Sequence, residues 1–151
     1  MIHKMILISD GWNYDSKPFP GVEILQKLII DHTGQGSFIS YISNKENNEL
    51  KVKRNISFSI EPNQATFILN SLHDFFKENE PIKLDYIKNW ECTLIDQDKN
   101  EVTYSGAMVG KVNYDSIDLT EYIRSVTKIE NCFVFNTMDR TDLGYGCYCA
   151  E

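Results

Sequence analysis

One segment constrains the fold of this chain more than any other: NWECTLIDQDKNEVTYSG, residues 89–106. Each half of it alternates apolar and polar residues, which is the pattern of a β-strand with one buried face. Because neighbouring residues on a strand point to opposite faces, only a turn of odd length brings both apolar sets onto the same face. The sequence therefore predicts a β-hairpin with an odd-length turn. The apolar sets are Trp90, Cys92 and Leu94 on the first strand, and Val102 and Tyr104 on the second.

A turn through residues 97–99 meets this requirement. It places Trp90 opposite Gly106, so that the indole covers a position without a side chain. It also leaves Asn100 to take the left-handed conformation that three-residue loops require. The other face of the hairpin is then expected to be the solvent side. It carries Glu91, Thr93, Thr103 and Ser105, with Ile95 as its one apolar member.

The tip of this hairpin holds Asp96, Asp98 and Asn100 at a spacing of two, as in a cation-binding loop. A calcium loop of that type also needs glycine at its sixth position and a bidentate glutamate at its twelfth. Here these positions are Glu101 and Ala107, so the sequence predicts no metal site. We expect the acids to form a contact surface for a protein partner instead. The candidate residues are Glu91, Asp96, Asp98 and Glu101.

The strongest helix pattern lies at residues 61–81, EPNQATFILNSLHDFFKENEP. Pro62 suits the first helical position, where its missing N–H costs nothing, and Pro81 marks the end. A second helix is expected after Asp118, which can cap it, with Glu121 completing a capping-box pattern. Apolar residues at three- and four-residue steps give each helix a buried face. These residues are Ala65, Ile68, Leu72, Phe75 and Phe76 in the first helix, and Leu119, Tyr122, Ile123 and Val126 in the second.

Strand patterns fill most of the remainder. Residues 2–9 predict a strand, and residues 22–44 predict a hairpin that turns at HTGQGS. A helix over residues 22–31 remains the alternative, since the alternation there is not strict. The apolar run NCFVFN, residues 131–136, predicts a central strand. Residues 51–60 predict a further strand, with Val52, Ile56, Phe58 and Ile60 on its apolar face and Arg54 as an exception near an edge.

The order of these elements is strands, helix, strand hairpin, helix, strand. Such segregated runs are typical of an α+β domain in two layers, with two helices packed on one face of a mainly antiparallel sheet. A length of 151 residues suits one domain with one core. No linker or repeat divides the chain, so we expect residues 1–151 to form a single domain.

Two segments stand apart from this scheme. Residues 10–21 form a loop rich in proline and glycine that carries Trp12, Tyr14 and Phe19. These rings either pack on the core or, if exposed, provide a docking surface. Residues 137–151 either add a strand or fray. Cys147 and Cys149 form a Cys-x-Cys pair there, which is too few ligands for a zinc site.

The chain has a net charge of −7 that is unevenly distributed. Residues 1–60 hold seven basic and six acidic residues, a balance of +1, whereas residues 61–151 hold eight basic and sixteen acidic residues, a balance of −8. Phosphate binding needs clustered Lys and Arg, so we expect no direct contact with nucleic acid. The balance favours a basic protein partner, or else serves only to keep the protein in solution.

No apolar run is long enough to cross a bilayer. The N-terminal stretch MIHKMILISDGW is soon interrupted by Asp10 and lacks the apolar length and cleavage site of a signal peptide. We therefore expect a cytoplasmic protein without a membrane contact.

Motifs of known chemistry are missing: there is no phosphate-binding glycine loop, no HExxH and no GxSxG. The three histidines are far apart in the sequence. Cys92 and Cys132 lie in apolar runs and are expected to be buried, unreactive thiols. The sequence thus indicates no catalytic residue and no cofactor, and it favours a protein that is not an enzyme.

The stretches NWECTLIDQDKNEVTYSG, IDLTEYIRSV and NCFVFN together resemble a loose group of small uncharacterised proteins from Firmicutes. That group shares a Trp hairpin, an Asp-Leu-Ser/Thr-x-x-Ile-Arg helix start and an LFVF-like strand. The resemblance covers residues 22–136 and implies the same fold but no activity. Arg124 matches the helix arginine of the group. We expect it to form a structural ion pair with Asp115 or Asp118, or, as the alternative, to bind a substrate.

These observations favour a non-catalytic protein-binding module. We expect an inhibitor or neutraliser, of the immunity or anti-defence type, that meets a basic surface such as that of a nuclease. One alternative is a small-molecule-binding or enzymatic domain with a pocket near Arg124. Another is a component of a larger assembly that docks through the aromatic loop.

Overall fold

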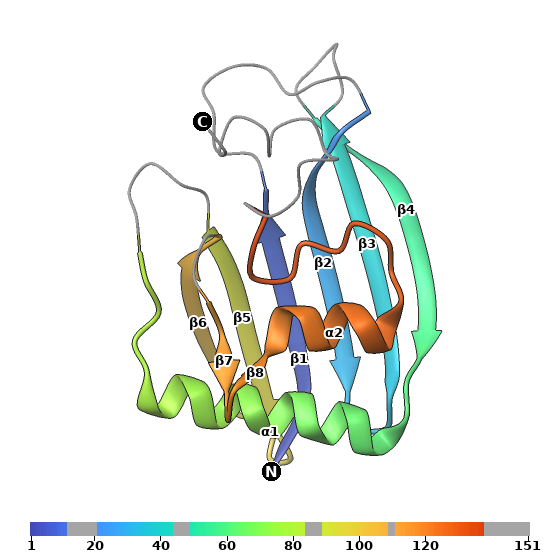
Figure 1. Cartoon of the computed structure of the whole chain (residues 1–151). Coiled ribbons are helices and arrows are strands. Elements are labelled where there is room, and N and C mark those ends of the chain that lie inside the picture. Colours follow the sequence, from blue (N-terminus) through green and yellow to red (C-terminus); the bar gives the residue numbers. More distant parts are fainter. Residues whose placement is uncertain (12–20, 44–48, 84–88, 109–110, 138–151) are drawn as a thin grey trace.

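The computed structural model describes residues 1–11, 21–43, 49–83, 89–108 and 111–137. Its main feature is a six-stranded antiparallel sheet in the order β4-β3-β2-β1-β5-β6 (Figure 1). The α+β prediction is therefore confirmed, and the 22–44 segment is a hairpin, not a helix. The strands are β1 (Ile2–Asp10), β2 (Glu23–Asp31), β3 (Gln35–Ser43), β4 (Leu50–Ser59), β5 (Asn89–Asp96) and β6 (Glu101–Ala107).

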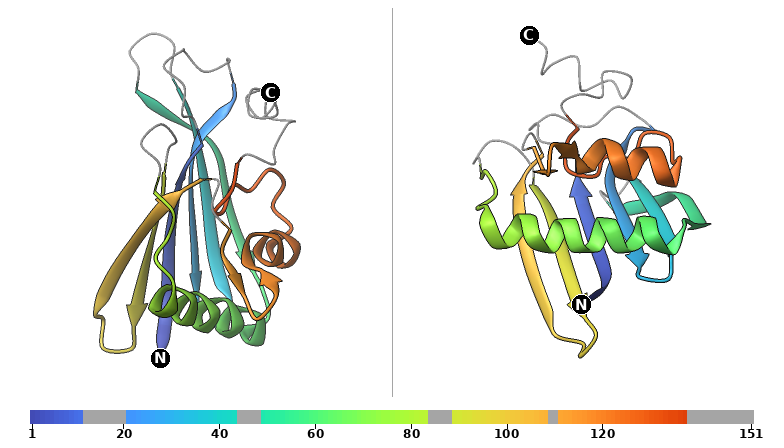
Figure 2. Two further views of the ribbon diagram at one scale, coloured as in Figure 1. Left: turned by 60° about the vertical axis from the view of Figure 1, so that its left-hand side comes forward. Right: turned by 60° about the horizontal axis from the view of Figure 1, so that its bottom comes forward.

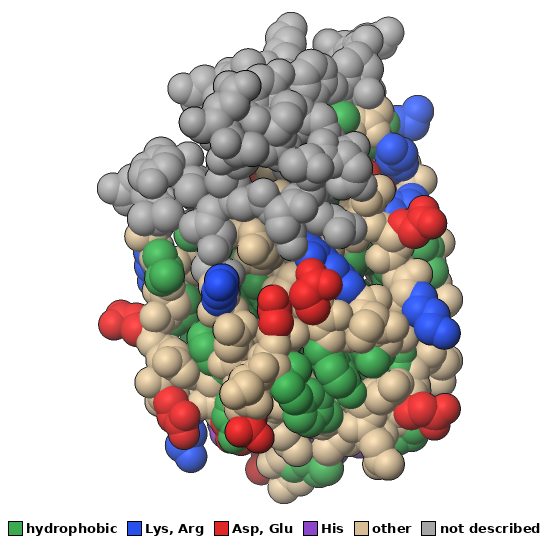
Figure 3. Space-filling model, in the orientation of Figure 1, with side chains coloured by type: hydrophobic (Ala, Val, Ile, Leu, Met, Phe, Trp, Pro, Cys, Tyr) green, Lys and Arg blue, Asp and Glu red, His purple; other side chains and the backbone are tan. Residues whose placement is uncertain are grey.

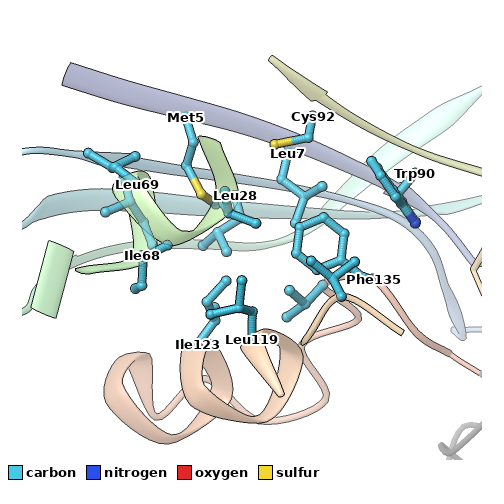
Figure 4. Close-up of a cluster of buried hydrophobic side chains, with 14 of the residues drawn as sticks. Met5, Leu7, Leu28, Ile68, Leu69, Trp90, Cys92, Leu119, Ile123 and Phe135 are labelled. Carbon is cyan, nitrogen blue, oxygen red and sulfur yellow. The ribbon is translucent and has the colours of Figure 1, made fainter. Parts of the chain in front are cut away.

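Two helices, α1 (Pro62–Glu78) and α2 (Leu119–Thr127), cover one face of this sheet (Figures 1 and 2). A short ladder of β7 (Asn113–Tyr114) and β8 (Ile117–Asp118) leads into α2. The core lies between the helices and the sheet (Figure 4). Side chains from both layers fill it, including Met5, Leu7, Leu28, Ile68, Leu69, Leu119 and Ile123, all at most 2% exposed.

The path of the chain explains the role of α1. Strands β1 to β4 form a meander that grows to one side of β1, and α1 then runs back across the sheet (Figure 1). This return brings β5 to the other edge of β1, and β6 pairs outside β5. The local signals for α1 act as predicted. Pro62 opens the helix, and the N–H of Glu61 donates to Oε1 of Gln64 at 3.1 Å.

The predicted inward position of Val52 is wrong. A bulge shifts the β3–β4 register between Ser40 and Tyr41, so that Arg54 pairs with Ser40 but Val52 pairs with Tyr41. The extra residue reverses the alternation of β4 beyond this point. Val52 is consequently 51% exposed. Arg54 does lie on an edge strand, as predicted.

The prediction of a central strand at NCFVFN is also wrong. The segment is irregular, with positive φ at Asn131 (53°) and Val134 (53°). It is nevertheless buried, with Cys132, Phe133 and Phe135 at most 1% exposed. Side chains take the place of a neighbouring strand. Ser9 donates to the carbonyl oxygen of Val134 at 2.6 Å, and Gln26 bonds to the Asn131 carbonyl oxygen and the Phe133 N–H, each at 2.7 Å.

Candidate binding site along the β5–β6 hairpin

The hairpin has the register that its apolar pattern predicted, with a three-residue turn. Trp90 lies under Gly106, where an added Cβ would stand only 2.6 Å from the indole Cζ2 atom. A side chain at position 106 would therefore force the ring or the strand to move. The pairs are Leu94 with Val102, Cys92 with Tyr104, and Trp90 with Gly106.

The left-handed residue of the turn is Lys99, with φ 66°, and not Asn100 as predicted. Asn100 belongs to the ladder instead, since its carbonyl oxygen accepts from the N–H of Asp96 at 3.0 Å. The carboxylate of Asp96 accepts from the N–H groups of Asn100 and Asp98, both at 2.9 Å. The hydrogen bond from the Asn100 N–H is the main reason why the pKa of Asp96 lies below its usual value. This carboxylate holds the turn.

The other three acids of the predicted contact surface are exposed. Glu91 lies opposite Ser105 and Glu101 opposite Ile95, which places both on the face turned away from the helices, and Asp98 lies at the tip. Within the described residues none of the three takes part in an ion pair. On the helix face, acidic and basic side chains are intermixed (Figure 3). The hairpin carries these three acids together with one exposed base, Lys99, at its tip.

β6 is also an outer strand of the sheet, and no described strand pairs with its outer edge. The N–H of Ala107 points away from β5 and donates to the carbonyl oxygen of Ile82 at 2.6 Å. Every second residue of an antiparallel strand directs its backbone groups to the same side. The N–H and C=O groups of Glu101, Thr103 and Ser105 therefore face this edge, where no described strand pairs with them.

A groove of about 440 Å³ follows this edge between β6 and the C-terminal end of α1. Its floor includes the ring of Tyr104, which stacks on Phe76 with 4.4 Å between the ring centroids. Charges of both signs line the wall formed by α1 and the residues after it. The groove is lined by Phe76, Lys77, Glu78, Asn79, Glu80, Pro81, Lys83, Thr103, Tyr104 and Ser105.

A second cavity, of about 240 Å³, lies next to the groove and shares Asn79, Glu80 and Pro81 with it. Trp90 lines this cavity and is 1% exposed. Its Nε1 atom has no hydrogen-bond partner, and it is the only such buried side-chain atom in the described residues. A buried donor without a partner destabilises a fold by about 1–3 kcal/mol. The remaining lining residues are Phe75, Ile82, Ala107, Lys111 and Val112.

Arg124 has a structural position. Its side chain is 9% exposed and pairs with Glu121 at 2.7 Å, not with Asp115 or Asp118. Nε donates to the carbonyl oxygen of Cys132 at 2.7 Å, and Nη2 donates to those of Phe133 and Asn136 at 3.2 and 2.8 Å. The guanidinium holds the irregular segment. The groove and the cavity described above are not lined by Arg124.

Sequence reasoning missed a polar cluster at the edge of the core. Glu23 is 4% exposed and receives Nε and Nη2 of Arg54 at 2.5 and 2.6 Å, together with the hydroxyl of Ser40. Arg54 also donates to the carbonyl oxygen of Glu130 at 2.7 Å. The only signal in the sequence was an arginine on an otherwise apolar strand face. Its partner could not be identified, because the two residues meet only through the β2–β3–β4 register.

Two histidines also meet unexpectedly. The rings of His3 and His32 stack with their centroids 4.0 Å apart, at the end of the β1–β2 ladder. Cys92 and Cys132 are both buried, as predicted, and burial raises the pKa of Cys92 to about 12. No group of three or more His, Cys, Asp or Glu side chains suited to a metal occurs in the described part of the chain.

Some predictions fall on other residues. The aromatic loop with Trp12, Tyr14 and Phe19, and the tail with Cys147 and Cys149, lie outside the described ranges. Neither of the described helices is long and apolar enough to span a membrane. In comparisons with known protein families and with curated proteins, nothing matches the chain. The resemblance found in the sequence therefore stays a prediction.

Proposed function

We propose that this protein is a non-catalytic protein-binding module that inhibits or neutralises a partner with a basic surface. The observation that carries the proposal is the outer edge of β6, which no described strand pairs with, beside three exposed acids that form no ion pair among the described residues, Glu91, Asp98 and Glu101. The buried free thiol of Cys92 fits a reducing compartment such as the cytoplasm.

The geometry of the edge supports one mode of contact. An extended segment of the partner adds to β6 as a further strand, and the outward backbone groups of Glu101, Thr103 and Ser105 provide its hydrogen bonds. Basic side chains on that segment meet the acids of the hairpin. Charges of opposite sign accelerate the encounter, so that association is faster at low salt.

The charge component is tested with two matched variants. Glu91→Gln, Asp98→Asn and Glu101→Gln together remove three charges from the hairpin, changing the net charge from −7 to −4. Glu61→Gln, Asp115→Asn and Glu130→Gln remove three exposed acids elsewhere and reach the same net charge. A partner captured from cells that produce the protein is titrated with each variant. We expect the hairpin variant to lose about tenfold in association rate at low salt, and the control to lose little.

The edge component needs a separate variant. Thr103→Pro removes an outward N–H without touching the pairing with β5, whereas Thr103→Val keeps the N–H. Both lose the hydrogen bond between the Thr93 and Thr103 hydroxyls, which is 2.8 Å long. Binding should weaken with proline and survive with valine. Equal binding by both, together with association that does not respond to salt, would contradict the proposal.

A further inference from the structure

We propose that the cavity beside Trp90 binds a small, neutral, mainly apolar molecule of one ring that carries a carbonyl oxygen. This inference is independent of the protein-binding role proposed for the edge of β6. It begins from the unpartnered indole N–H of Trp90, which is buried in a residue that lines a cavity of about 240 Å³.

The packing around Trp90 fixes the indole ring without providing a hydrogen-bond acceptor for this N–H. The indole is held edge-on by Phe135, with ring centroids 4.8 Å apart, and it also contacts Phe76 at 5.6 Å. Its nitrogen points away from Leu7 and Phe135 (Figure 4). The ring is therefore fixed in an orientation that leaves its one polar atom unpaired. Indole N–H is a donor only, so its partner must supply an acceptor.

The lining selects against ordered water as that partner. The polar lining residues Asn79, Glu80 and Lys111 are all exposed, and thus belong to the mouth, whereas Trp90 is 1% exposed. A buried water needs two to four polar partners, and the side chains of the described walls offer it none. These walls are formed by Phe75, Pro81, Ala107 and Val112, whereas Ile82, which is 58% exposed, belongs to the mouth.

Size and charge define the class of ligand. A cavity of about 150 Å³ with apolar walls is known to hold benzene, so a volume of about 240 Å³ accommodates one ring with a short substituent. The opposite charges of Glu80 and Lys111 at the mouth favour a molecule without net charge. A carbonyl oxygen on the substituent accepts from Trp90 Nε1. Ketones, aldehydes and amides of one ring meet all three conditions.

The test uses acetophenone and cumene, which have nearly the same shape but differ in the carbonyl oxygen. The chain has two tryptophans, so Trp12→Phe leaves Trp90 as the single indole signal in a ¹⁵N–¹H NMR spectrum. Acetophenone should shift this proton downfield in a saturable manner and bind about fivefold more tightly than cumene, as one hydrogen bond provides. Absence of a saturable shift, or equal affinity for the two probes, would overturn the proposal.

Ala107→Leu provides the positional control, because it fills the cavity from a lining position that is fully buried. It should abolish the acetophenone shift while the spectrum stays dispersed. Retained binding in a folded Ala107→Leu protein would move the site elsewhere and overturn the assignment. If this variant does not fold, the comparison of the two probes on the Trp12→Phe protein still decides the matter.

Discussion

Glu23 illustrates how a buried charge is made tolerable. Burial on its own would raise the pKa of this carboxyl group. The hydrogen bonds from Arg54, Ser40 and Gln26, with the positive charge of Arg54, more than offset it and hold the pKa below the ordinary 4.5. A group with a lowered pKa adds stability above its unfolded pKa and loses that contribution as the pH falls through its folded pKa. The pair therefore stabilises the fold at neutral pH and weakens in acid, below about pH 4.5.

Removing Arg54 should lower the stability of the fold more than removing the charge of Glu23. Arg54→Met leaves the Glu23 carboxylate buried and unpaired, and should lower the free energy of unfolding by about 3 kcal/mol at pH 7. Glu23→Gln should lower it by only about 1 kcal/mol, because the side chain of Arg54 is 24% exposed and can be hydrated. Urea unfolding measures both.

The pH dependence provides a check on that interpretation. In Arg54→Met, burial raises the pKa of Glu23, so protonation in acid relieves the charge while the wild type loses its pair. The gap in stability between the two proteins should narrow from pH 7 to pH 4. A gap that stays the same from pH 7 to pH 4 would show that Arg54 acts through packing on Phe38, 4.8 Å from its ring centroid, and not through Glu23.

Lys99 carries backbone strain that a single substitution can remove. Its φ of 66° is unfavourable for a residue with a side chain, whereas glycine adopts it freely. Lys99→Gly should raise the free energy of unfolding by about 0.5–1 kcal/mol in thermal or urea melts. Asn100→Gly should instead be destabilising, since the amide of Asn100 bonds to Asp96. The opposite order of the two effects would mean that the left-handed position is Asn100 after all.

At the level of elements, the irregular segment around Phe133 is held by the guanidinium of Arg124 in addition to Ser9 and Gln26. Arg124→Lys keeps the charge but cannot reach three carbonyl oxygens, those of Cys132, Phe133 and Asn136. We expect a loss of about 3 kcal/mol of stability and faster hydrogen exchange in a peptide covering residues 129–137. Glu121→Gln is the control. It removes only an ion-pair partner that is 62% exposed, and should change stability by less than about 0.5 kcal/mol. Unchanged exchange in Arg124→Lys would contradict the assigned role.

The same segment shows where sequence patterns stop being informative. The register of the β5–β6 hairpin could be predicted because alternation and turn length are local properties of the sequence. Only a turn of odd length places the apolar residues of both strands on the same face. NCFVFN has an apolar run that suits a buried strand and a buried irregular segment equally well. The groups that decide between them, Ser9 and Gln26, lie 125 and more than 100 residues away in sequence.

The candidate site likewise has features that could be predicted from the sequence and features that could not. Exposure of Glu91, Asp98 and Glu101 followed from the alternation of the hairpin. The internal use of Asp96 did not, because it depends on the actual turn geometry. The Trp90 cavity could not be foreseen either. It forms where three parts of the chain come together: the residues after α1, strand β6, and Val112. No local sequence pattern predicts these contacts.

For the whole molecule, the two-layer architecture makes the faces of the sheet unequal. Leu7 and Ile8 are neighbours on β1, but Leu7 is fully buried against the helices and Ile8 is 37% exposed on the other face. Leu7→Ala should reduce the free energy of unfolding by about 3 kcal/mol, and Ile8→Ala by about 1 kcal/mol or less. Similar losses for the two variants in urea unfolding would indicate that something covers the second face in solution.

The central position of β1 has a consequence for synthesis. β1 is synthesised before the other described strands and pairs on one side with β2, but its other side must wait for β5, whose last residue is Asp96. At typical elongation rates this interval is on the order of ten seconds. For that time the nascent protein exposes the inner edge of its own sheet, an attachment point for any other unpaired strand. Arrival of the β5–β6 hairpin ends this exposure and moves the open edge outward to β6, where acidic residues flank it.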